Sequence, residues 1–272
     1  MNPLLVLIAH SFKRVRTLVL SMAALLAVFQ VYLIVIARSI ERSGSFEEIG
    51  KAIPPFLRQL LGPAIATLMS FRGIVSIGYS HLIVMWSLIA LAIALATVPA
   101  SEVETGFMDL LLSRPMARHW IIVRSIAMVT GCTVGLLLLM IAGTWIGLNW
   151  LAPPGVEWPS AALISSMAIN LGLLTLSWGG IAMAIGAASR RRAVAGSFTG
   201  LLALATFLLD YVARQWHPAE SIAWVSPFHY FSPFDLLLGA SLSDRDVMVL
   251  IGMALLGFGL AWVIFSRRDI SH

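Results

Sequence analysis

The sequence predicts an all-α membrane protein with six transmembrane helices. Of its 272 residues, 59% are hydrophobic and only 11% are charged, and the mean hydropathy is +0.92. A soluble domain carries about 25% charged residues, so this composition excludes an ordinary globular protein. Six long stretches contain no Asp, Glu, Lys or Arg, and each is near or above the roughly 20 residues that a helix needs to cross a bilayer core. These stretches are residues 17–37, 73–101, 125–156, 158–189, 193–209 and 247–266.

The charge-free stretches predict helices rather than the strands of a β-barrel. Their apolar residues are continuous, whereas barrel strands are short and alternate in polarity. In lipid, a helix also satisfies its backbone groups within its own segment. We therefore expect one transmembrane domain over residues 1–272, with spans at about 17–37, 75–98, 122–148, 160–188, 193–212 and 247–265.

The placement of charge predicts the orientation. With six spans, both termini lie on the same side, which would hold 11 of the 18 basic residues and 4 of the 13 acidic ones. The positive-inside rule puts that side in the cytoplasm. This orientation explains the formal net charge of +5 without a nucleic-acid partner. We expect a multi-pass protein of a bacterial or archaeal cell (inner) membrane.

Residues 1–16 are apolar first and basic afterwards, and they are too short to cross the bilayer. We expect an interfacial amphipathic helix with Lys13, Arg14 and Arg16 at the headgroups, although a plain cytosolic flank of the first span fits equally well. The first apolar run is about 21 residues long, beyond the usual core of a cleaved signal, and predicts a retained anchor. The single cysteine, Cys132, lies within a span and predicts a packing role.

Two longer segments are predicted on the outer side. Residues 38–72 contain Pro54, Pro55 and Pro63, which favour a loop with one or two short helices. Within residues 210–246, the aromatic and proline-broken run 226–234 favours a re-entrant or interfacial piece over a loop in water.

Glycines four residues apart mark two spans as candidates for close helix packing. Such spacing lets helix backbones approach each other without any hydrophobic driving force. Both a dimer interface and packing within one subunit fit the pattern. The residues are Gly131, Gly135, Gly143 and Gly147 in the third span and Gly196 and Gly200 in the fifth.

Several chemistries are absent from the sequence. It has no Gly-x-x-x-x-Gly-Lys-Ser/Thr run for phosphate binding and no His or Cys spacing typical of a metal site. His81 lies in the second span and is expected to be hydrogen-bonded rather than a ligand. No nucleophile and base are placed to meet within the membrane, so we expect no enzymatic activity and no cofactor in this chain. Few charges lie within the spans, which disfavours ion-driven transport and requires another energy source.

A charged insert at residues 101–118 separates the second and third spans. Ser101 and Glu104 have the spacing of a capping box, and Glu102 and Asp109 add negative charge where a helix dipole favours it. Pro115 would end the helix, after which basic residues return the chain to the membrane surface. These features predict a short amphipathic helix under the membrane.

Met108, Leu111 and Leu112 lie on one face of this helix by their spacing. The face could pack on the bundle itself, or it could contact a soluble partner.

In this insert the chain resembles the permease subunits of type-2 ABC exporters. The matching pattern is Glu-x-Glu-x-Gly after the second span, then Asp-Leu-Leu-Leu-Ser-x-Pro and an arginine. The six-span layout, the amphipathic start and the proline-rich outer segment also fit. Phe107 departs from the pattern, because related chains commonly have threonine there. The matching residues are Glu102, Glu104, Gly106, Asp109 to Ser113, Pro115 and Arg118.

The resemblance implies a half-transporter. Two permease chains, expected as a homodimer, would bind two separate ATPase subunits that hold the ATP and Mg. The complex would export an amphipathic or hydrophobic substrate. An alternative within the family is a subunit that only transmits ATPase motion to an outer-side partner, as in the maturation of periplasmic metalloenzymes. The implied ATPase-coupling residues are Glu102, Glu104, Gly106, Phe107, Met108, Asp109, Leu111, Leu112, Pro115 and Arg118.

Overall fold

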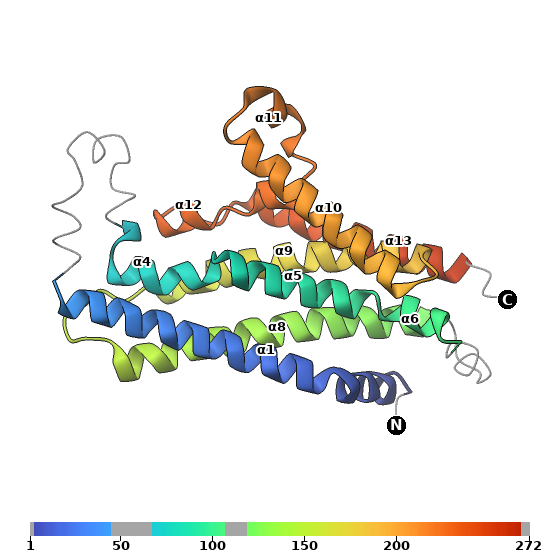
Figure 1. Cartoon of the computed structure of the whole chain (residues 1–272), viewed down its shortest axis with the longest axis horizontal. Helices are drawn as coiled ribbons and strands as arrows, with labels where there is room; N and C mark the ends of the chain where they lie inside the picture. The colour runs from blue at the N-terminus through green and yellow to red at the C-terminus, as the bar shows by residue number, and fades with distance from the viewer. Residues whose placement is uncertain (1–2, 45–66, 107–118, 268–272) are drawn as a thin grey trace.

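The computed structural model describes residues 3–44, 67–106 and 119–267, and these form an all-α bundle (Figure 1). No strand occurs within these ranges. Six helical segments are long and apolar enough to span a membrane, which confirms the predicted all-α, six-span class. Their bounds are Leu7–Arg42, Phe71–Glu104, His119–Leu151, Ala161–Ala188, Arg192–Ala213 and Asp244–Arg267.

The first helix, α1, runs from Pro3–Arg42 without interruption. A separate interfacial helix within residues 1–16 is therefore not what the structure shows, since the described part of that segment is the beginning of α1. The sequence explains the continuity. No glycine or proline follows Pro3 until Gly44, and Gly44 has the positive φ of 67° that ends a helix readily.

The second span consists of several helical pieces. These are α4 (Phe71–Ser76), η1 (Ile77–Tyr79), α5 (Leu82–Ala96) and α6 (Val98–Glu104). His81 caps α5, because its Nδ1 accepts a hydrogen bond of 3.3 Å from the Ile83 amide. The prediction that His81 is hydrogen-bonded is thus confirmed. Pro99 lies in the first turn of α6, where a missing N–H costs little.

The remaining spans are α8 (His119–Leu151), α9 (Ala161–Ala188), α10 (Arg192–Ala213) and α13 (Asp244–Arg267). Helix α9 is the most buried of the six and packs against α5, α8 and α13, while α1 lies along α8 (Figure 1). Trp178 of α9 is fully buried in the core. Helix α10 is the least covered, and it leads to the projecting helix α11 (His217–Ala223).

The closest helix contact is between α9 and α13. A Cβ added at Gly180 would lie 2.6 Å from the Ala254 carbonyl oxygen, and one added at Gly257 would clash with the Gly180 backbone. A methyl group at either position would therefore push the two helices apart.

The six glycines predicted to mediate packing fall into two groups. Gly143 and Gly147 pack within the chain, because an added Cβ would lie 3.1 Å from Ala27 Cα or 2.6 Å from Ile34 Cδ1 of α1. For these two, the interpretation as packing within one subunit holds. The other four have nothing within 4 Å of such a Cβ, and their role in a dimer stays a prediction. They are Gly131, Gly135, Gly196 and Gly200.

The proline-rich segment after α10 folds back into the bundle. It forms α11, the short helix η2 (Pro227–Tyr230) and α12 (Pro233–Leu237). The Phe228 ring is buried, and its centroid lies 5.3 to 5.8 Å from those of Phe207, Trp86 and Trp178. Aromatic packing of this kind holds η2 against three helices.

Candidate functional site

The candidate site lies at the end of the bundle that carries α6, which we call the α6 end. The starts of α1, α8 and α10 and the end of α13 lie at the same end (Figure 1). Residues 107–118, the remainder of the insert, connect α6 to α8 here but fall outside the described residues. The predicted coupling residues Phe107, Met108, Asp109, Leu111, Leu112, Pro115 and Arg118 therefore have no structural description.

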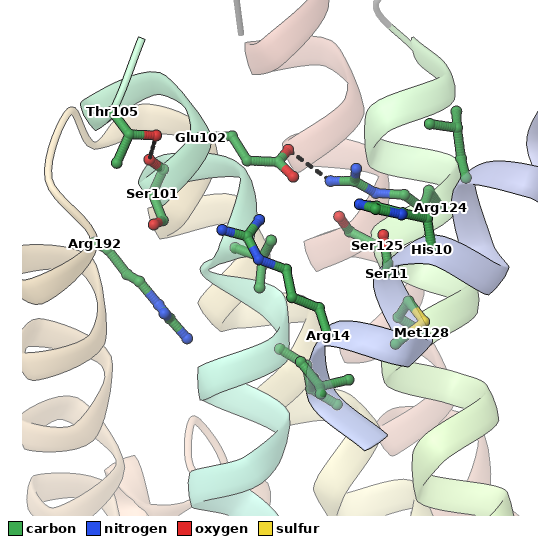
Figure 2. A pocket seen from close by; sticks show the side chains of 14 residues that line it. His10, Ser11, Arg14, Ser101, Glu102, Thr105, Arg124, Ser125, Met128 and Arg192 are labelled. Carbon is green, nitrogen blue, oxygen red and sulfur yellow. Dashed lines mark hydrogen bonds and ion pairs between the residues drawn. The ribbon is translucent and has the colours of Figure 1, made fainter. Parts of the chain in front are cut away.

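Glu102 of α6 and Arg124 of α8 form an ion pair at the α6 end. Arg124 Nη2 donates to Glu102 Oε2 at 2.6 Å, and the side chains are only 4% and 6% exposed, respectively (Figure 2). Charges this deeply buried must be paired, because each has lost its water. The pair thus joins the end of the second span to the start of the third.

Glu104 links α6 to α10, the fifth span. Its Oε2 accepts a hydrogen bond of 2.9 Å from the backbone amide of Arg192, the first residue of α10. This amide has no partner inside the helix, and a carboxylate beside it is favoured by the helix dipole. Arg192 also donates from Nη2 to the Ala94 carbonyl at 3.0 Å, near the break between α5 and α6.

The predicted capping box at Ser101 is wrong. Helix α6 already begins at Val98, so Ser101 lies inside it, and the Ser101 carbonyl accepts a bond of 2.9 Å from Thr105 Oγ1 (Figure 2). The helix ends instead at this point, since Gly106 has φ +68°. The prediction failed because Pro99 starts a helix as effectively as a serine cap does.

A cavity of about 260 Å³ opens beside the ion pair, between α1 and the α5–α6, α8 and α10 helices (Figure 2). Arg14 of α1 extends into it and makes no hydrogen bond or ion pair with any described residue. Its lining combines polar and apolar side chains. It comprises Leu7, His10, Ser11, Arg14, Val15, Leu95, Val98, Ser101, Glu102, Thr105, Arg124, Ser125, Met128 and Arg192.

Sequence reasoning identified the two acids of this site but not their partners. Neither Arg124 nor Arg192 was predicted from the sequence to pair with them. Their positions carried a usable signal, because Glu102 and both arginines border charge-free stretches, with Glu104 two residues further on, and so they lie at similar depth. Which acid meets which base depends on helix rotation, and spacing alone does not give that.

A second polar cluster lies at the opposite end of the bundle, which we call the α11 end. Asp210 Oδ2 accepts hydrogen bonds of 3.1 and 3.0 Å from Nε and Nη2 of Arg214, and its Oδ1 lies 3.4 Å from His229 Nδ1. Two cavities of about 350 and 390 Å³ adjoin Asp210 and share Asp235 as an exposed wall residue.

Within the described ranges, no group of three or more His, Cys, Asp or Glu side chains is placed to hold a metal ion. Comparison with models of known protein families found no match, and a search of curated proteins also found none.

Proposed function

We propose that the chain is the membrane-spanning subunit of an ATP-driven transporter of the type-2 ABC exporter kind. Two copies pair, two separate ATPase subunits bind at the α6 end, and the complex exports an amphipathic or hydrophobic substrate. The observation that supports this most is the double attachment of α6, through Glu102 to α8 and through Glu104 to α10.

The attachment of α6 to α8 and α10 is suited to transmitting a displacement of the insert to the spans. The insert at 107–118 continues directly from α6 and leads into α8. A displacement of the insert acts on both helices, and breaking one partner of a buried ion pair costs about 3–5 kcal/mol. Helices α6 and α8 therefore move together, and Glu104 adds α10. In this view Glu102 and Glu104 transmit motion inside the bundle, while residues 107–118 of the insert contact the ATPase.

The energy source also favours this class. The sequence lacks a P-loop, so this chain does not hydrolyse ATP by that mechanism. The charge-free stretches offer few groups for ion coupling. A separate ATPase subunit would supply the energy that neither ATP hydrolysis by this chain nor ion coupling provides.

Substitutions on the predicted apolar face of the insert test the proposal. The full chain carrying Leu111→Asp and Leu112→Asp should lose copurification of the ATPase from its native membranes, because two charges prevent an apolar face from docking. The matched control is Ile222→Asp with Val225→Asp, an exposed apolar pair at the α11 end. Equal ATPase recovery from both double variants would refute docking at the insert.

The second candidate is a subunit that only relays motion to an outer-side partner. The α11 end favours it to some degree, since Trp216, Ile222, Trp224 and Val225 are all exposed around α11. Reconstituted vesicles separate the two functions. Efflux that accompanies substrate-stimulated ATP hydrolysis supports export, whereas hydrolysis stimulated by an outer-side protein without efflux supports relay.

A further inference from the structure

The cavity at the α6 end has an excess of positive charge that the ion pairs do not use. Arg124 is neutralised by Glu102, and Glu104 lies beside the amide of Arg192. Arg192 donates one guanidinium hydrogen bond to the Ala94 carbonyl, which is neutral and so leaves the positive charge of Arg192 uncompensated. Arg14 has no partner among the described residues, which leaves a cation directed into an open space.

Hydrogen-bonding side chains lie near this cation. His10 and Ser11 lie one turn before Arg14 on α1, and Ser101 lies across the cavity on α6 (Figure 2). An arginine fork with hydroxyl and imidazole donors around it matches the several acceptor oxygens of a phosphate group. The volume of about 260 Å³ exceeds that of several waters at about 30 Å³ each, so a phosphodiester fits.

The apolar part of the lining points to a lipid rather than a soluble anion. Val15, Leu95, Val98 and Met128 form the wall on the bilayer side of the polar groups. Arg14 precedes the first charge-free stretch by three residues, and so lies at headgroup depth. The predicted orientation gives this end to the cytoplasmic leaflet, where anionic lipids concentrate and basic pockets between helices bind their headgroups.

We propose that this cavity binds the phosphate of an anionic phospholipid headgroup, with Arg14 as its main ligand and His10, Ser11 and Arg192 around it. The bound lipid joins α1 to α6 and α8, and so holds the start of the first span against the helices that carry the ion pair. The inference does not depend on transport or on an ATPase.

Native mass spectrometry of the full chain in detergent tests the site. The purified protein is titrated with phosphatidylglycerol and, in parallel, with phosphatidylcholine. In detergent no charged membrane surface attracts lipid, so the comparison reports the site itself. Arg14→Gln should weaken binding of the first phosphatidylglycerol about tenfold, which is the scale of one charge-assisted hydrogen bond.

Neighbouring basic residues give matched controls. Lys13→Gln and Arg16→Gln remove the same charge from the same helix but do not line the cavity, and they should change binding less than about twofold. Arg191→Gln likewise controls for Arg192→Gln, whose expected effect is smaller than that of Arg14→Gln. All of these side chains belong to exposed residues, so folding is retained.

Three results would overturn the proposal. Equal losses in Arg14→Gln and Arg16→Gln would show attraction by charge alone. Equal affinity for phosphatidylcholine would show no headgroup selection. Displacement of the first phosphatidylglycerol by millimolar inorganic phosphate would assign the cavity to a soluble anion instead.

Discussion

Both ends of the bundle pair an arginine with a buried acid, but the two pairs do different things. At the α6 end, Arg124 and Glu102 come from different spans, 22 residues apart, and their side chains are only 4% and 6% exposed, respectively. At the α11 end, Arg214 is four residues from Asp210 on the same helix end, and its side chain is 57% exposed. The first pair joins helices, whereas the second mostly stabilises one helix terminus.

This difference separates a rigid end from an adjustable one. The ion-pair contact of Asp210 with His229, at 3.4 Å, adds to the Phe207–Phe228 ring packing that holds α10 against η2, and His229 is 39% exposed. Partly solvated contacts of this kind exchange with water at little cost. Under the proposed function, motion that enters at the α6 end is passed on through the buried pair, whereas the partly solvated contacts and the two cavities leave the α11 end able to change shape.

The largest effect is expected from breaking the buried pair. Arg124→Met or Glu102→Met alone should cost about 3–5 kcal/mol, because each leaves a buried charge without a partner. The double variant should recover most of the loss, since apolar residues replace both charges. Cys132 is the single cysteine and is buried, so its reaction with a thiol-reactive dye on heating reports unfolding.

Arg214→Met is the matched control for this prediction. It removes an arginine from the exposed pair, and should cost no more than about 1 kcal/mol. Similar losses in Arg124→Met and Arg214→Met would contradict the distinction between the two ends.

The next largest effect concerns the packed centre that carries both ends. Gly257→Ala should destabilise by about 1–3 kcal/mol, because its methyl group meets the Gly180 backbone and α13 must move away from α9. Gly259→Ala lies on the same helix with nothing within 4 Å of the new Cβ. It should be neutral or slightly stabilising, since alanine favours helix. Equal melting of the two variants by the Cys132 assay would contradict the close contact.

The six spans could be predicted from the sequence because a helix that crosses a bilayer needs a continuous apolar stretch of about 20 residues. Charge-free stretches can be identified directly from the order of residues, and the six spanning helices coincide with them. Boundaries were harder where a signal was ambiguous. The basic cluster at Lys13 to Arg16 indicated a change of environment, but nothing in those residues breaks a helix, so α1 continues through it.

The site could be predicted only in part, because its geometry depends on how helices rotate against one another. The acids Glu102 and Glu104 were identified as functional from their place in the insert, yet their partners were not. The glycines show the same limit. Gly143 lies against α1 whereas Gly131 is open, since a separation of twelve residues, at about 3.6 per turn, directs the two glycines to different faces of α8.

A smaller effect is expected at the α11 end. Asp210→Asn should cost about 1–2 kcal/mol, because the amide loses the charge-assisted bonds to Arg214 and the contact with His229. Local hydrogen exchange over residues 226–232 should rise more than the melting temperature falls. Asp235→Asn, on an exposed residue lining the same cavities, is the control and should change neither. Exchange confined to α6 and α8 would show that the ends are not independent.

The smallest effect sharpens the role of Glu104, which is exposed yet bonded to the first amide of α10. Glu104→Ala should cost about 0.5–1 kcal/mol, the scale of a lost helix cap, and should speed exchange of the Arg192 amide. Glu104→Gln keeps an acceptor oxygen and loses only the charge, so its effect should be smaller. In the transporter complex that we propose, Glu104→Ala should retain ATP hydrolysis but transport less substrate per ATP, because α10 no longer follows α6. An unchanged exchange rate of the Arg192 amide in Glu104→Ala would show that Glu104 does not link α10 to α6, so that only α6 and α8 would move together.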